Sequence, residues 1–202
     1  MAGFAATLNS LKRMLAPPAQ PKRLLVAKRL HLFAALGAGI AATLTLLIAY
    51  YATLALLPPA TAYPATLYPF AGWATRMDLA QFMGSLIYPP VPTALTWWLG
   101  FIALAGTLVT LGVVYAFLLS WTLQTSSLFH GVGFGGALFV GLALTLTVAN
   151  GLHPAVLRNA LPDTGVLLLG WSALATIQLL IVHLLYGAVL GTVYHRLSAV
   201  RA

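Results

Sequence analysis

Residues 183–197, HLLYGAVLGTVYHRL, close the last apolar run of the chain and combine groups that rarely share one membrane helix. Steps of four residues from His183 reach two glycines, Gly187 and Gly191, so these positions follow one face of a helix. Lipid tails are as apolar as leucine, so membrane helices associate through close packing, which small residues permit. The stretch therefore predicts a transmembrane helix with Gly187 and Gly191 as helix-packing positions. Leu190, about 100° around the helix from Gly191, should face lipid or a looser contact.

The composition of the 202-residue chain is that of a protein solvated mostly by lipid. Hydrophobic residues make up 61% of it and charged residues only 6%, whereas soluble domains contain about 25% charged residues. A membrane span needs roughly 20 apolar residues. Runs of this kind without Asp, Glu, Lys or Arg cover about 31–57, 93–119, 132–150 and 165–194. We therefore expect an all-α integral membrane protein with four transmembrane helices.

The distribution of basic residues predicts the topology. Eight of them precede the first span or follow the last: Lys12, Arg13, Lys22, Arg23, Lys28, Arg29, Arg196 and Arg201. Only Arg76 and Arg158 lie in the loops on the other side. Because cytoplasmic segments beside spans are enriched in Lys and Arg, both termini should be cytoplasmic, in a multi-pass protein of the inner (cytoplasmic) membrane. Topology also accounts for the net charge of +8, so we expect no nucleic-acid partner.

The chain divides into a basic arm, residues 1–30, and a four-helix transmembrane domain, residues 31–202. In the arm, apolar residues recur at helical spacing, with Lys12 and Arg13 beside that stripe. This pattern predicts either a short amphipathic helix that binds anionic lipid headgroups or a frayed tail. Lipids are therefore among the expected partners.

The outer loop, residues 58–92, contains a second amphipathic pattern in RMDLAQFMGSLIYPP, residues 76–90. Apolar residues stand at positions i, i+3, i+4, i+7 and i+8: Leu79, Phe82, Met83, Leu86 and Ile87. The spacing predicts a helix lying in the membrane interface. Asp78 should fall in its first turn, where a carboxylate interacts favourably with the helix dipole.

Every predicted span carries a face of small residues. The longest such face lies in the third span: Gly133, Ala137 and Gly141, with Gly131 and Gly135 beside it. We interpret Gly133, Ala137 and Gly141 as further helix-packing positions. Together with the glycines of the last span, they predict a tight four-helix core and additional faces for partner subunits.

Three segments carry a resemblance to a known family: DLAQFMGSL (78–86), HGVGFGGALF (130–139) and HLLYGAVLGTVYHRL (183–197). Their order resembles that in a family of small four-span membrane proteins of bacteria and archaea whose last helix has the form H-L-x-Y-G-x-x-L-G-x-x-Y. The matching residues here are His183, Leu184, Tyr186, Gly187, Leu190, Gly191 and Tyr194. The family has no established activity, so the resemblance implies a fold and no chemistry. Its members carry another histidine in the second span, and TWWLGFIALAGTLV (96–109) lacks it.

The groups that catalysis or ion coupling would need are missing from the predicted spans. Both acids, Asp78 and Asp163, fall in outer loops, and cysteine is absent. The sequence contains no phosphate loop, dinucleotide fingerprint or H-E-x-x-H metal motif. We therefore expect no catalytic residue, no metal site and no enzymatic activity.

His183 is the one histidine placed deep in a span. An intramembrane histidine is a candidate ligand of haem or chlorophyll. The alternative is a neutral imidazole that hydrogen-bonds across the bundle to Tyr, Ser, Thr or Gln. Haem held by two histidines would need a second one at the same depth, and the sequence offers none. We therefore expect no cofactor, and keep haem or chlorophyll binding by His183 as the alternative.

These features favour a non-catalytic structural or accessory subunit of a larger membrane complex, with other integral membrane subunits as partners. A respiratory or photosynthetic electron-transfer assembly is the first choice of complex. Two alternatives stay open: a haem- or chlorophyll-binding membrane protein that uses His183, and a small oligomeric transporter of neutral solutes.

Overall fold

The computed structural model describes residues 31–56, 78–88, 93–121, 127–161, 163–169 and 173–199. Their elements are α2 (Leu32–Leu56), α3 (Leu79–Ile87), α4 (Ala94–Trp121), α5 (Ser127–Asn150), α6 (Pro154–Leu157), the 3-10 helix η2 (Val166–Leu168) and α7 (Ala173–Ala199). No strand occurs within these ranges. The all-α class is therefore confirmed. The expected basic arm, residues 1–30, lies outside the described residues.

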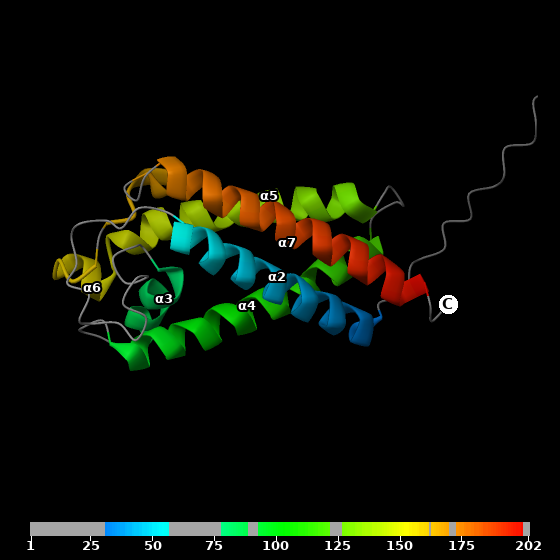
Figure 1. Cartoon of the computed structure of the whole chain (residues 1–202), viewed down its shortest axis with the longest axis horizontal. Coiled ribbons are helices and arrows are strands. Elements are labelled where there is room, and N and C mark those ends of the chain that lie inside the picture. The colour runs from blue at the N-terminus through cyan, green and yellow to red at the C-terminus, as the bar shows by residue number, and fades with distance from the viewer. Residues whose placement is uncertain are drawn as a thin grey trace, which may run out of the picture.

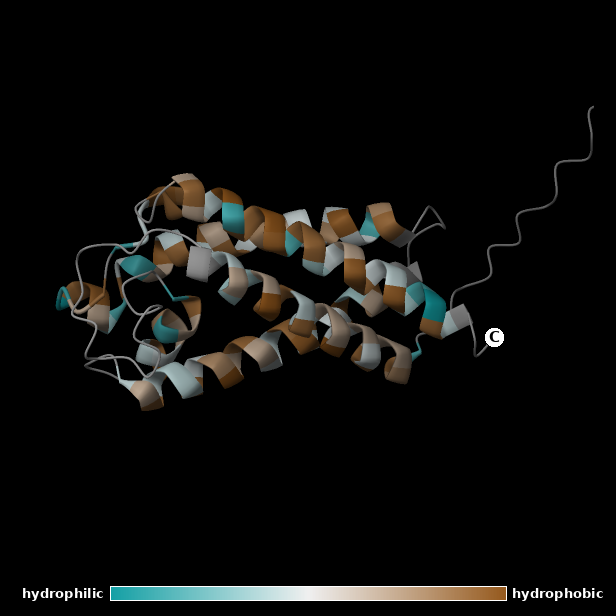
Figure 2. Cartoon of the chain, in the orientation of Figure 1, coloured by the Kyte–Doolittle hydropathy of each residue, from teal (hydrophilic) through white to brown (hydrophobic). Residues whose placement is uncertain are grey.

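Four of the helices, α2, α4, α5 and α7, are long and apolar enough to cross a membrane. They run antiparallel in a bundle, and hydrophobic residues cover most of their length (Figures 1 and 2). The start of α2 and the end of α7 lie at the same end of the bundle (Figure 1), as an even number of crossings requires. The four-span prediction is thus confirmed, while the cytoplasmic placement of the termini stays a prediction.

The boundaries of two spans differ from those expected. Helix α5 begins at Ser127, ahead of the expected 132, and α7 runs from Ala173 to Ala199 in place of 165–194. The segment before α7 is not helical in the expected way, because Gly165 and Leu167 have φ angles of 66° and 53°. It forms η2 instead, which packs on α5. The length of an apolar run does not show whether its first residues form a helical turn or a loop that packs on the bundle.

Helix α7 is central to the packing, because it contacts both α5 and α2, while α2 also contacts α4. Two faces of α7 are consequently buried, and Leu190 and Gly191 both lie inside the bundle. The expectation that Leu190 faces lipid is wrong: its side chain is fully buried. Leu190 and Gly191 are separated by about 100° around α7. Neighbouring helices cover both of these directions, so Leu190 does not face lipid.

Candidate functional sites

Glycines bring the backbones of α5 and α7 close together. A Cβ atom on Gly187 would lie 2.8 Å from the carbonyl carbon of Gly131 and closer still to its oxygen. A Cβ atom on Gly131 would in turn lie 3.1 Å from the Cα of Gly191. Real Cβ atoms essentially never approach within 3.0 Å, so even alanine does not fit at Gly187. The structure places both glycines predicted in the last span, Gly187 and Gly191, in this contact.

The packing face of α5 is not the predicted one. Gly133, Ala137 and Gly141 are exposed, and a Cβ atom on Gly133 or Gly141 would meet no described residue within 4 Å. The residues against α7 are instead Gly131 and Gly135. Two residues turn an α-helix by about 200°, and Gly133 is two residues away from both Gly131 and Gly135. It therefore lies on the side of α5 that faces away from α7. Gly133, Ala137 and Gly141 therefore do not pack against the described helices, and their interpretation as packing positions stays a prediction about contacts with other residues or molecules.

Two further glycine pairs join the remaining helices. Between α2 and α4, a Cβ atom on Gly112 would lie 2.6 Å from the Cα of Gly39. Between α3 and α4, a Cβ atom on Gly100 would lie 2.8 Å from the carbonyl carbon of Ala80, and Gly84 is equally enclosed by Thr96. The pair in α3 and α4 was not among the predicted positions. Its only sequence signal is an isolated glycine in each of two neighbouring segments.

Asp78 forms a buried polar cluster at the end of the bundle opposite the start of α2 and the end of α7. Its side chain is 7% exposed, and Oδ1 accepts hydrogen bonds from the Tyr51 hydroxyl at 3.1 Å and the Ala80 backbone N–H at 2.8 Å. Oδ2 accepts a hydrogen bond from the indole N–H of Trp97. The carboxylate thus caps α3 and links it to α2 and α4.

Burial raises the pKa of the Asp78 carboxyl, while the hydrogen bonds from Trp97, Ala80 and Tyr51 act in the opposite direction. Desolvation is the larger effect, because a buried carboxylate loses its water shell. Asp78 is the N-cap residue of α3; it precedes the first turn, in which it was expected. An acid assigned by sequence to an outer loop is therefore buried.

Helix α3 packs into the bundle through polar as well as apolar residues. Gln81 is 1% exposed, and its Nε2 donates to the Thr96 hydroxyl at 2.6 Å. Phe82 is also buried, whereas Leu86 and Ile87 are exposed. The expected apolar stripe is therefore split between the bundle and the exterior, because the contact through Gly84 fixes which side of α3 meets α4.

His153 connects α3 to the short helix α6. Its Nδ1 accepts hydrogen bonds from the N–H groups of Ala155 and Val156, so the proton of the neutral ring resides on Nε2. That nitrogen lies 3.0 Å from the carbonyl oxygen of Phe82 and donates to it. The ring is completely buried and therefore fixes α6 against α3.

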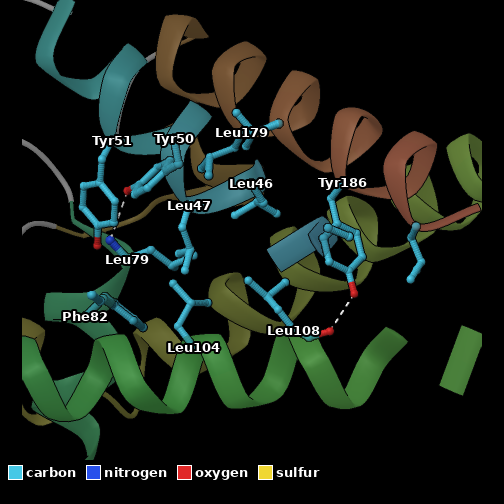
Figure 3. Close-up of a cluster of buried hydrophobic side chains, with 14 of the residues drawn as sticks. Leu46, Leu47, Tyr50, Tyr51, Leu79, Phe82, Leu104, Leu108, Leu179 and Tyr186 are labelled. Carbon is cyan, nitrogen blue, oxygen red and sulfur yellow. Dashed lines mark hydrogen bonds between the residues drawn. The ribbon is translucent and has the colours of Figure 1, made fainter. Parts of the chain in front are cut away.

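Hydrogen bonds also cross from one helix to another. The Tyr186 hydroxyl of α7 donates to the Leu108 carbonyl of α4 at 2.6 Å, and the Leu79 N–H donates to the Tyr50 hydroxyl at 3.1 Å (Figure 3). Gln178 of α7 donates to the Thr53 hydroxyl of α2 at 2.6 Å. Each bond satisfies polar groups that would find no water as a hydrogen-bond partner inside the lipid layer.

A hydrogen bond across the bundle was the expectation for His183, but among the described residues its hydrogen-bond partner lies in its own helix. Its Nδ1 lies 2.7 Å from the carbonyl oxygen of Leu179, and since a carbonyl only accepts, Nδ1 carries the proton. The side chain is 5% exposed, and the Phe139 ring lies edge-on at 6.1 Å. A haem or chlorophyll ring at Nε2 would have to displace neighbouring protein atoms, so the site as folded does not fit a macrocycle.

The fold and these contacts define a class: a multi-pass, four-helix membrane protein whose helices meet through glycine backbones. Comparison with protein-family models, curated proteins and solved structures finds no match to this chain. The resemblance to a four-span family therefore stays a hypothesis. Among the described residues, no group of three or more His, Cys, Asp or Glu side chains is positioned to hold a metal ion.

Proposed function

We propose that the protein is a non-catalytic structural subunit that binds other integral membrane proteins through the exposed small-residue face of α5. This face is defined by Gly133, Ala137 and Gly141. The observation that carries the proposal is that all three residues are exposed and that, in the part of the chain that the structure describes, nothing lies within 4 Å of a Cβ atom at either glycine. The helix that bears them is also the least covered of the four, with 17% of its span buried against 28–44% in the others.

The chemistry of such a face supports a helical partner over lipid alone. Glycine inside a helix costs about 0.5–1 kcal/mol relative to alanine, and a surface that meets only lipid gains nothing in return. A second helix does gain, because a small-xxx-small face lets it approach the backbone and make many dispersion contacts. The same device joins α5 to α7 through Gly131 and Gly187.

The engagement of the polar groups supports a non-catalytic role. The carboxylate of Asp78 is occupied by donors from Tyr51, Ala80 and Trp97, and the enclosed His183 ring is hydrogen-bonded to its own helix. Groups held in this way stabilise the fold and are not presented to a substrate. The enclosure of His183 also argues against the haem- or chlorophyll-binding alternative. The proposal extends to integral membrane partners as a class, since no described residue favours an electron-transfer complex over another assembly.

Photocrosslinking in native membranes tests the proposal. A benzophenone amino acid at position 137 of α5 should crosslink to a distinct membrane protein, identified by mass spectrometry. The same probe in place of Ile48, which is 69% exposed on α2, serves as the matched control and should crosslink mainly to lipid. Equal protein crosslinking from both positions, or lipid adducts alone from position 137, would contradict the proposal.

A further inference from the structure

An open cleft of about 660 Å³ lies where α5 ends, between that helix, α6 and residues 163–166. Asn150 lines it and is also the last residue of the α5 span. If the span fills the hydrocarbon layer, the cleft begins at the level of the lipid headgroups. None of the glycine contacts or the Asp78 cluster belongs to it.

One wall of the cleft is polar and fixed in place. Oδ1 of Asp163 accepts hydrogen bonds from the Asn150 side-chain amide and, at 2.6 Å, from the Gly165 N–H. The side-chain oxygen Oδ1 of Asn150 in turn accepts a hydrogen bond from the Thr164 N–H at 3.2 Å. Oδ2 of Asp163 has no hydrogen bond to any residue in the described ranges. The carboxylate is therefore held by one oxygen and has the other available to a donor.

The opposite side of the cleft is aliphatic. Val156, Leu157 and Val166 line it, and Leu157 and Val166 are 65% and 67% exposed. Asp163 is the only charged residue among the described residues that line the cleft. The surface thus pairs a single negative charge with exposed hydrocarbon.

The segment that forms this wall is tied to the bundle. The Leu167 N–H donates to the Thr147 hydroxyl at 3.1 Å, and Leu168 is completely buried. Asn159, Leu167 and Leu168 all have positive φ angles, of 55°, 53° and 69°, which non-glycine residues seldom adopt. Backbone conformations of this kind persist only where the surroundings enforce them, so the cleft is formed before any ligand arrives.

We infer that this cleft binds a primary ammonium group attached to an aliphatic chain. An ammonium donates hydrogen bonds to carboxylate oxygens and neutralises the charge of Asp163, while the hydrocarbon next to it covers Val156, Leu157 and Val166. Two sources share this chemistry: the ethanolamine headgroup of a membrane phospholipid, and a free alkylamine. The inference does not depend on the proposed function, because it concerns a different surface.

Equilibrium dialysis of decylammonium against the full chain in phosphatidylcholine nanodiscs tests binding, with empty nanodiscs subtracted. We expect saturable binding that weakens at least tenfold in Asp163→Asn, which keeps an oxygen for Asn150 and Gly165 but removes the charge. Arg158→Gln changes an exposed charge outside the cleft lining and should leave binding unchanged. Val166→Trp keeps the carboxylate and fills the cleft, so it should also abolish binding, which guards against misfolding of Asp163→Asn.

Equal binding by the original chain and Asp163→Asn, or equal binding of decyl sulfate, would overturn the inference. A second arm separates the two sources of the ammonium. Native mass spectrometry of the chain extracted from membranes should show retained phosphatidylethanolamine if the ligand is a lipid, and this retention should be lost in Asp163→Asn. Decylammonium binding without retained phosphatidylethanolamine assigns the cleft to free amines. Retention of phosphatidylglycerol to the same extent would count against an ammonium site.

Discussion

Gly187 of α7 lies directly against the backbone of Gly131 of α5, where a Cβ atom on Gly187 would stand 2.8 Å from the Gly131 carbonyl carbon. This contact predicts that Gly187→Ala lowers the free energy of unfolding by about 1–3 kcal/mol, the usual cost of overpacking. Gly133→Ala on the open side of α5 is the matched control and should be neutral or slightly stabilising. Thermal unfolding in detergent measures both. Equal loss of stability in the two variants would mean that the α5–α7 contact is not specific.

Asp78 predicts a pH dependence of stability. The pKa of its carboxyl is raised above the ordinary value of 3.8 by burial, so the folded chain holds this proton at pH values where the unfolded chain has lost it. Its contribution to stability is therefore full at low pH and is lost as the pH rises through the folded pKa. The melting temperature should fall along this range, and the fall should be smaller in Asp78→Asn. A melting temperature that rises with pH more in the original chain than in the variant would contradict this account of Asp78.

The hydrogen bond from Tyr186 to the Leu108 carbonyl predicts a cost for Tyr186→Phe. Both groups are buried in the bundle, and loss of the hydroxyl leaves the carbonyl with one partner fewer. The free energy of unfolding should fall by about 1 kcal/mol. Tyr88→Phe, at a side chain that is 55% exposed, should change it far less. Denaturation of the two variants in mixed micelles makes the comparison, and an equal effect would remove the assigned role of the bond.

His183→Phe should leave the protein folded, with a loss of about 1 kcal/mol or less. The reason is that the lost hydrogen bond joins His183 to Leu179 within α7 and holds no other helix. The purified original chain and the variant should have the same visible absorption spectrum. A band present in the original chain and absent or shifted in the variant would establish His183 as a pigment or haem ligand.

The four spans could be predicted because the length and apolarity of a helix are local properties of the sequence. The face that each span turns inward could not be predicted. Helix α5 has glycines at 131, 133, 135 and 136, and these do not all lie on one face. Only the fit against Gly187 selects Gly131 and Gly135. Leu190 illustrates the same limit, since its burial depends on α7 having two helical neighbours.

The surroundings of the polar side chains could be predicted from the sequence less well than the apolar spans. Asp78 follows a long loop in the sequence, and its burial requires Tyr51 of α2 and Trp97 of α4 to meet at the same point. Residues so distant in the chain carry no shared periodicity. The sequence does not predict the cleft beside Asp163 either, because residues 165–169 have the composition of the start of an apolar span. In the structure, positive φ angles make them a packed loop.

Native electrophoresis of gently solubilised membranes shows whether the exposed face of α5 binds a partner. Gly141→Leu is compared with Gly106→Leu, since no described residue lies within 4 Å of a Cβ position at either glycine, and we expect neither substitution to disturb the packing among the described helices. If this face binds a partner, the original chain and Gly106→Leu should migrate in a complex larger than the single chain. Gly141→Leu should be released from that complex. Migration of Gly141→Leu in the same complex as the original chain, or of the original chain as a monomer, would contradict the claim.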